Sequence, residues 1–303
     1  MTKNPICIYH GNCADGFGAA WVFKRFGGTK FDFHAGVYQE PPPDVDGRDV
    51  YLVDFSYKRA VVEQIREQAN RVVLIDHHKT AIEDLAPLIG SGAIESLTSL
   101  DNSGAVLAWQ WMMGDLDQMP ALLAHIEDRD LWRFVLPHTR EIQACVFSHP
   151  YDFDVWDELV LRADTEAGVA DLIREGQAIE RKHHKDVNEL LGVTMRQMEI
   201  GGHVVPVANL PYTLVSDAAH IMAKGAPFAA CYWDTPGGRV FGLRSADDGL
   251  DVSEIAKIYG GGGHKHAAGF RVPWVCNRCE GFYYLTQEQA ILAAIRGEEL
   301  ADD

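Results

Sequence analysis

The chain has 303 residues, 47% of them hydrophobic, and a formal net charge of −17. This length is enough for about two domains with well-buried cores. The acidic balance, without any lysine- or arginine-rich stripe, argues against binding to a long nucleic-acid duplex, which generally needs a basic face. No stretch approaches the roughly 20 apolar residues that span a bilayer, and the N-terminus lacks an apolar signal segment, so a cytoplasmic protein without membrane attachment is expected.

Three short apolar runs near the N-terminus each end in metal-capable side chains. The runs and the residues that follow them are 5–9 with His10 and Asp15, 49–53 with Asp54, and 71–75 with Asp76, His77 and His78. Such runs are typical of buried parallel strands, and ligands of open α/β sheets bind where these strands end. A single Asp at such a place has another explanation, because Asp commonly caps helices and opens turns. Capping has no use for paired histidines, so the three endings together predict a metal site.

The mixture of many carboxylates with fewer imidazoles indicates which ions would bind. It suits a borderline-hard divalent cation, with manganese as the best fit and magnesium, cobalt or iron as alternatives. The set has more ligands than one ion needs, so two ions bridged by Asp54 are expected. Two metal ions roughly 3.5–4 Å apart hold both the attacking and the leaving oxygen of a phosphoryl displacement and activate water. The sequence therefore predicts hydrolysis of a phosphate ester or anhydride.

Helical spacing of apolar residues predicts helices over 16–26, 59–70 and 103–113. Carboxylates then alternate with arginine between Ile126 and Trp132. Considered alone, this run is typical of a surface ion-pair cluster. Beside the three strand ends it offers Asp128 as a further metal ligand, with Asp130 as the alternative.

A long helical pattern over 164–191 separates the chain into an N-terminal part (1–150), a connecting part (151–193) and a C-terminal part (194–303). His183 and His184 lie within this pattern. Adjacent residues on a helix point about 100° apart, so these two are expected on the surface and not around one ion.

The C-terminal part is expected to contain strands at 204–208, 228–232 and 239–243, followed by four consecutive glycines that end at Gly263. Successive glycines can present backbone N–H groups to an anion, and a helix beginning near His264 would add partial positive charge. A flexible linker is the usual alternative for a glycine run. The immediate return to the packing residues Ala-Ala-Gly-Phe favours an ordered segment.

The six cysteines fit reduced thiols better than a disulfide framework. Cys276 and Cys279 have zinc-knuckle spacing, but a structural zinc site usually needs a second pair, and none is visible in the sequence. Packed or solvent-facing thiols are therefore expected, and the role of this pair stays open.

Taken together, these motifs resemble those of the DHH-family phosphoesterases that carry a C-terminal DHH-associated domain. That family includes nano-RNases, RecJ-like exonucleases and cyclic dinucleotide phosphodiesterases. The resemblance covers nearly the whole chain. It implies an α/β protein with an N-terminal parallel-sheet catalytic domain, a connecting helix and a smaller C-terminal α/β domain that binds substrate.

The resemblance also implies roles for individual residues. The expected metal ligands are His10, Asp15, Asp54, Asp76, His77 and Asp128. The expected catalytic residues are His78 and Asp76, and the expected substrate-binding residues are Arg244, Gly262, Gly263 and His264. Many family members have a second acidic residue in the first motif, where this chain has Asn12 and Cys13. The occupancy of one of the two metal sites is therefore open.

The expected activity is manganese-dependent hydrolysis of phosphodiester or phosphomonoester bonds in nucleotides or short single-stranded oligonucleotides. The alternative is a nucleotide-binding or sensing module with impaired catalysis, which the missing acidic residue favours. The sequence leaves open whether the substrate is oligo-RNA, oligo-DNA, a cyclic dinucleotide or phosphoadenosine phosphate. It also leaves open whether the chain forms a homodimer.

Overall fold

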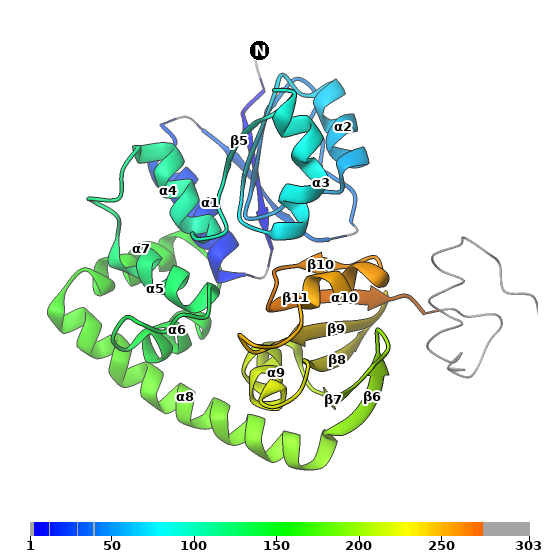
Figure 1. Ribbon diagram of the computed structural model, residues 1–303. Coiled ribbons are helices and arrows are strands. Elements are labelled where there is room, and N and C mark those ends of the chain that lie inside the picture. Colours follow the sequence, from blue (N-terminus) through cyan, green and yellow to red (C-terminus); the bar gives the residue numbers. More distant parts are fainter. Residues whose placement is uncertain (1–2, 12, 29, 39, 275–303) are drawn as a thin grey trace, which may run out of the picture. The chain divides into compact units, whose positions relative to one another are not determined.

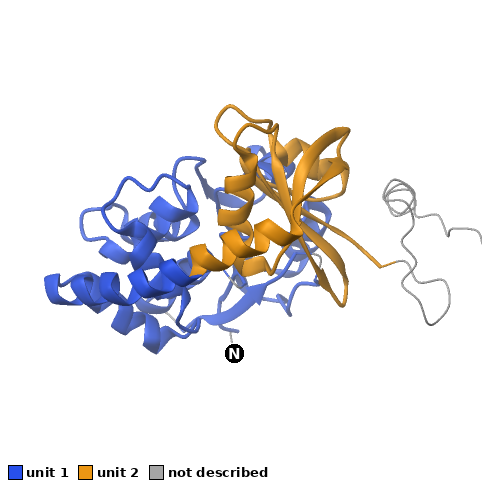
Figure 2. Cartoon of the chain, turned by 90° about the horizontal axis from the view of Figure 1, so that it is seen from below, with its two compact units in different colours: residues 1–182 blue, residues 183–303 orange. Residues whose placement is uncertain are grey.

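The computed structural model describes residues 3–11, 13–28, 30–38 and 40–274. Asn12, Cys276 and Cys279 lie outside the described residues. The chain divides into two compact units, residues 1–182 and 183–303 (Figure 2). The boundary falls inside the helix α8 (Glu166–Thr194), within the segment that was expected to connect two domains.

The first unit contains a five-stranded sheet with the strand order β2-β1-β3-β4-β5, in which every neighbouring pair is parallel. Its strands are β1 (Ile6–His10), β2 (Asp32–Gly36), β3 (Asp49–Val53), β4 (Arg71–Asp76) and β5 (Glu95–Thr98). The chain moves outward from β1 to the edge strand β2 and then returns to β3 on the other side of β1. The strand order thus reverses between β1 and β3, and open α/β sheets bind ligands at the carboxyl ends of strands at such a switch point.

Helices cover both faces of this sheet (Figure 1). Along β1, Cys7 packs in one core with the helices α1 (Ala14–Phe26), α4 (Gly104–Met113) and α5 (Ala121–Asp130). Its neighbour Ile8 packs in a second core with α2 (Arg59–Gln68) and α3 (Lys79–Gly90). Successive strand residues point to opposite faces, which explains why these strands are apolar throughout. The helices α6 (Thr139–Phe147) and α7 (Phe153–Ala163) follow on the α5 side.

The second unit contains a six-stranded sheet in the order β10-β11-β9-β8-β7-β6. Only the pair β7–β8 is parallel among its described strands. The strands are β6 (Arg196–Ile200), β7 (His203–Asn209), β8 (Ala229–Thr235), β9 (Gly238–Arg244), β10 (Gly262–Gly263) and β11 (Ala267–Val272). A short 3-10 turn (Tyr212–Leu214) leads into α9 (Val215–Ala223), which packs on one face, and α10 (Val252–Ile258) packs on the other.

The expected α/β class, with a parallel-sheet unit first, is confirmed. Among the described helices, none is both long enough and apolar enough to pass through a lipid bilayer. The expectation for His183 needs correction, because this side chain is only 20% exposed and its Nε2 lies 2.9 Å from Asp217 Oδ2. His183 therefore fastens α8 to α9 instead of simply facing solvent.

Candidate metal centre

The candidate centre lies at the switch point of the first sheet. His10 is the last residue of β1, Asp54 directly follows β3, and His77 directly follows β4. Because these strands are parallel neighbours, their carboxyl ends bring the three side chains to one edge. Asp54 has a left-handed backbone with φ of 53°. Such a conformation is uncommon for a residue other than glycine and is found preferentially at functional sites.

The potential ligands form two groups that meet at Asp54. The ligand atoms of Asp15, His77 and Asp130 lie within 4.8 Å of one another, and so do those of His10, Asp54 and His78. The Nε2 atom of His77 lies 3.1 Å from Asp54 Oδ1 and 3.5 Å from oxygens of both Asp15 and Asp130. Nδ1 of His10 lies 3.5 Å from Asp54 Oδ2. Asp54 is thus in contact with imidazoles of both groups, as a bridging ligand would be.

The carboxylates of the first group repel one another. Burial raises the pKa of Asp15 well above its usual range, and the charges of Asp54 and Asp130 add to the effect. Burial opposes a charge on His77, but the neighbouring carboxylates raise its pKa well above the ordinary value. In the absence of a cation, protonated imidazole is therefore the positive charge that balances these acids.

Asp54 shows most directly that the residues present fit a metal ion. It is 1% exposed, and neither of its carboxylate oxygens receives a well-aligned hydrogen bond from a described residue. A buried carboxylate without such hydrogen bonds lowers the stability of the folded protein unless a cation compensates its charge. Carboxylate oxygens combined with imidazole nitrogens are the ligands of manganese or iron rather than of thiophilic ions.

A helix end holds Asp15 in place. Its two carboxylate oxygens accept hydrogen bonds from Gly104 N at 2.6 Å and Ala105 N at 2.9 Å, the first two amides of α4. Helix N-termini stabilise carboxylates through these unpaired amides and their partial positive charge. Ser103 caps the same helix, and its backbone N–H donates to Glu127 at 2.9 Å, which ties α4 to α5.

Gly104 is a site residue that the sequence analysis missed. A Cβ atom at this position would lie only 2.4 Å from the Cβ of Asp54, so any side chain would displace the Asp54 carboxylate. The sequence offered one sign of this role. A glycine directly follows the N-cap serine of an otherwise apolar helix, although glycine lowers helix stability.

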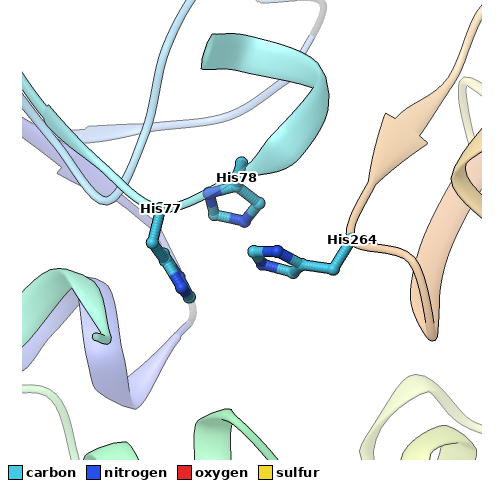
Figure 3. A group of neighbouring side chains, drawn as sticks. All are labelled: His77, His78 and His264. Carbon is cyan, nitrogen blue, oxygen red and sulfur yellow. The ribbon is translucent and has the colours of Figure 1, made fainter. Parts of the chain in front are cut away.

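Asp76 contacts both histidines that follow it, and its expected role as a metal ligand stays a prediction. Its Oδ1 accepts hydrogen bonds from His77 N at 2.8 Å and His78 N at 3.2 Å, and it lies 2.8 Å from His78 Nδ1. Asp76 belongs to neither group of potential ligands among the described residues. Asp76 therefore orients His77 and His78, which stand between the end of β4 and the start of α3 (Figure 3).

Asp130, and not Asp128, lies with Asp15 and Asp54 among the potential ligands. Asp128 is 3% exposed and accepts hydrogen bonds from Val135 N, Leu136 N and Thr139 Oγ1 at 2.8, 3.1 and 2.6 Å. These hydrogen bonds fix the conformation of the loop that follows α5. The sequence alone does not indicate whether Asp128 or Asp130 faces the sheet, so both residues were candidates.

These two acids make a matched pair for mutation. Burial raises the pKa of Asp128, but its hydrogen bonds to Thr139, Val135 and Leu136 hold it below the usual range. Asp128→Ala is expected to lower the free energy of unfolding by about 2–4 kcal/mol. The stabilisation is fully present above the unfolded pKa of about 3.9 and is lost as the pH falls through the lower folded pKa. Urea titrations at pH 7 and pH 3 measure both effects.

Asp130→Ala is the control, since it is expected to weaken metal binding with little change in unfolding free energy. The assignment would be wrong if Asp128→Ala were the variant that lost metal binding and Asp130→Ala the one that lost stability.

The expected substrate-binding residues come together in the second unit, but in a different secondary structure. Gly262 and Gly263 form strand β10, which pairs with β11, and His264 N donates to Ala267 O at 2.8 Å. His264 therefore lies on the turn of a tight β-hairpin and not at the start of a helix (Figure 3). Arg244 ends the neighbouring strand β9, directly opposite Ala267.

The glycines of this hairpin are explained by close backbone packing. A Cβ at Gly263, whose φ is 141°, would lie 2.5 Å from Ala267 O, and one at Gly261 would lie 2.1 Å from Gly269 O. Arg244 donates one hydrogen bond to Ser216 Oγ at 2.8 Å, which fixes its direction. Whether these residues bind substrate stays a prediction.

Two further side chains belong to the surroundings of the centre. Cys13 is the N-cap residue of α1, and burial together with Asp54 and Asp130 raises the pKa of its thiol, an effect that His10 reduces. The ring of Tyr38 packs edge-on against that of His10, with centroids 5.3 Å apart. Tyr38 follows a strand predicted by no clear sequence pattern, which is why the sequence analysis missed it.

No family model matches the sequence. Among curated proteins, an uncharacterised protein of Acanthamoeba polyphaga mimivirus is 27% identical over 288 residues. That match covers 87% of this chain and 66% of the relative, so the chain spans slightly less than two thirds of the relative's length.

Solved structures give a comparison of the fold. The DHH domain of a member of a ribosomal protein family has a TM-score of 0.59 at 13% identity, over 97% of this chain and 86% of the other. The chain has the DHH-domain fold. An exopolyphosphatase-related protein from Bacteroides fragilis has a TM-score of 0.52 at 13% identity, over 97% and 91% of the two chains. At this level of identity the similarity concerns the fold of the DHH domain and not its substrate.

Proposed function

We propose that this DHH-fold chain is a divalent-metal-dependent phosphoesterase acting on nucleotides or short single-stranded oligonucleotides. The observation that carries the proposal is the buried Asp54 carboxylate, which lacks well-aligned hydrogen bonds and lies between two groups of potential ligands. The fold shared with a DHH domain and with an exopolyphosphatase-related protein supports it. Manganese is the proposed ion because the donors are mostly carboxylate oxygens with fewer imidazoles.

The proposed ligands divide into two sites that share Asp54. Asp15, His77 and Asp130 would hold one ion, and His10 with Asp54 would contribute to the other. Bound divalent ions supply Lewis acidity toward phosphoryl oxygens and make water more acidic. Cys13 stands beside the second site, where its thiol offers a softer donor than a carboxylate.

His78 is the proposed contact to the substrate. A carboxylate can only accept, so the 2.8 Å contact with Asp76 places the proton of His78 on Nδ1. A His78 side chain that is also protonated on Nε2 would donate a hydrogen bond from this atom to a phosphoryl oxygen. Asp76 thereby acts on the substrate through His78. Arg244 and the β10–β11 hairpin are proposed to bind a further phosphate of the substrate.

The proposal is tested by hydrolysis assays with manganese on dinucleotides, short RNA and DNA oligomers, cyclic dinucleotides and phosphoadenosine phosphate. The Asp76→Ala, His77→Ala double variant is the negative control. Turnover by the native protein that disappears in the variant is expected. Metal binding without turnover on any member of the panel would overturn the enzyme assignment and support the nucleotide-sensing alternative.

A further inference from the structure

A further group of potential metal ligands lies in the first unit and shares no residue with those around Asp54. The thiol of Cys145, the imidazole of His149 and the carboxylate of Glu175 have ligand atoms within 4.8 Å of one another. Cys145 lies on α6 and Glu175 on α8, two helices that are neighbours in the first unit (Figure 1). The backbone stays helical at Ser148, so the four-residue spacing places Cys145 and His149 on one side of the chain.

Close packing of α6 against α8 fixes the positions of these side chains. Cys145 is fully buried and belongs to the same hydrophobic core as Leu172 of α8. Gly176 lets the two backbones touch, because a Cβ there would overlap the carbonyl oxygen of Glu141 at the start of α6. Glu175 directly precedes Gly176, so its backbone is held beside the helix that carries Cys145.

The contacts within the group resemble those of a zinc site in which a proton takes the place of the ion. The Cys145 thiol donates a hydrogen bond to Glu175 Oε2, with a distance of 3.2 Å between Sγ and the oxygen, and Arg162 donates to Glu175 Oε1 at 2.8 Å. A tetrahedral zinc ion, with Zn–S of about 2.3 Å and Zn–O of about 2.1 Å, holds these two ligand atoms about 3.5 Å apart. Zinc can therefore replace the thiol proton, which leaves to water, with little movement of either side chain. Arg162 keeps its bond to Oε1 and orients the carboxylate, as hydrogen-bond partners of ligating carboxylates do.

The group is accessible to an ion from solvent. The Glu175 side chain is 47% exposed, and His149 is half-buried. Among the residues that the structure describes, none forms a hydrogen bond with the His149 ring, so its nitrogens are available to an ion. Burial, together with the Glu175 carboxylate, raises the pKa of the Cys145 thiol to about 12. A coordinating metal ion nevertheless deprotonates a thiol, because the ion stabilises the thiolate.

We propose that Cys145, His149 and Glu175 bind a zinc ion that joins α6 to α8, with water as the fourth ligand. A thiolate and an imidazole select zinc over manganese or magnesium, whereas the donors around Asp54 are mostly oxygen atoms. The site is thus chemically distinct from the candidate metal centre and does not depend on the proposed phosphoesterase function. The alternative is that the thiol and the carboxylate form only a hydrogen bond between two helices.

Cobalt reveals the thiolate ligand, because cobalt bound to sulfur gives a charge-transfer absorption band in the near ultraviolet. The titration uses the full chain with Asp54→Asn, Cys276→Ser and Cys279→Ser, which weakens the candidate centre and removes the paired thiols. One equivalent of cobalt should produce the band, and Cys145→Ser in this background should abolish it. Cys13→Ser is the matched control and should keep the band. No band, or a band that survives Cys145→Ser, would overturn the site.

Zinc affinity is measured in the same background by calorimetric titration. His149→Ala and Glu175→Gln each remove one accessible ligand, and glutamine still accepts the hydrogen bond of Arg162, so the fold should persist. Each change is expected to lower the zinc affinity by at least about tenfold, a loss that even indirect partners of metal ligands cause. His34→Ala removes another half-buried histidine of the first unit and should leave the affinity unchanged. Unchanged affinity in His149→Ala and Glu175→Gln would support the hydrogen bond alone.

Thermal unfolding measures the link between α6 and α8. Saturating zinc should raise the Tm of the background protein, because the ion binds only the folded state, and should leave the Tm of Cys145→Ser nearly unchanged. No substrate enters any of these measurements, so a failure of the proposed phosphoesterase function would not alter them. Equal Tm shifts in both proteins would contradict a zinc ion bound by Cys145.

Discussion

Replacing Asp54 by asparagine is expected to reduce kcat by at least about a thousand-fold, because bound metal ions contribute several kcal/mol to phosphoryl transfer. Asparagine keeps the shape of the side chain and tolerates the left-handed backbone at this position, so the fold should persist. The substitution also removes a buried charge whose oxygens lack well-aligned hydrogen bonds. Burial opposes this charge, but the imidazoles of His10 and His77 hold the pKa of Asp54 well below its usual range, so the metal-free variant should be less stable than the native protein.

Calorimetry with and without manganese measures the second part of this expectation. Manganese should raise the Tm of the native protein, since it binds only the folded state, and should leave the Tm of Asp54→Asn almost unchanged. Asp32→Asn is a suitable control, because Asp32 lies on the strand β2 and pairs with Arg48 at 2.6 Å, and it belongs to neither group of potential ligands among the described residues. A turnover of Asp54→Asn within a few-fold of the native value would contradict the bridging role.

Gly104→Ala is expected to damage the candidate centre directly, although it adds only one methyl group. The new Cβ would lie 2.4 Å from the Asp54 Cβ and 2.8 Å from its Oδ1, and no flexible side-chain end can give way there. Either Asp54 or the N-terminus of α4 must move, and the latter movement would release Asp15. Displacements of this size at a reacting centre commonly cost about a hundred-fold in rate. Steady-state kinetics and metal titration of the variant measure both consequences.

Gly192→Ala provides the matched control for this change. Gly192 also lies in a helix, is exposed, and has nothing within 4 Å of the position that a Cβ would take. Alanine there should be neutral or slightly stabilising, because it lowers the conformational entropy of the unfolded chain. If the two alanine variants behaved alike, the close packing of Gly104 on Asp54 would have no functional meaning.

The strand-end motifs could be predicted from the sequence because their signal is local. The run that ends at Asp76 is apolar over its whole length, as a central parallel strand buried on both faces must be. The edge strand β5 (Glu95–Thr98) has no buried residue on either face and gave no such signal. The helix α3 contains Pro87, which a pattern-based prediction takes as a break, although the helix continues to Gly90.

The candidate site was harder to predict where tertiary contacts decide it. Asp128 and Asp130 have similar sequence surroundings, and only the folding of residues 131–139 around Asp128 determines which acid faces His77. The role of Gly104 depends on Asp54, 50 positions earlier in the chain. Glycine runs likewise fit both a phosphate-binding loop and a tight hairpin, and the pairing with β11 selects the hairpin.

The most direct test of the proposed metal centre is anomalous diffraction from crystals of the native protein soaked in manganese and measured at the manganese absorption edge. The account predicts a peak bonded to an oxygen of Asp54 and to Nε2 of His77, with Asp15 and Asp130 as further ligands, and no peak at this place in Asp54→Asn. A second peak beside His10 would support the two-ion arrangement. Full manganese-dependent activity without any peak at Asp54 would contradict the account.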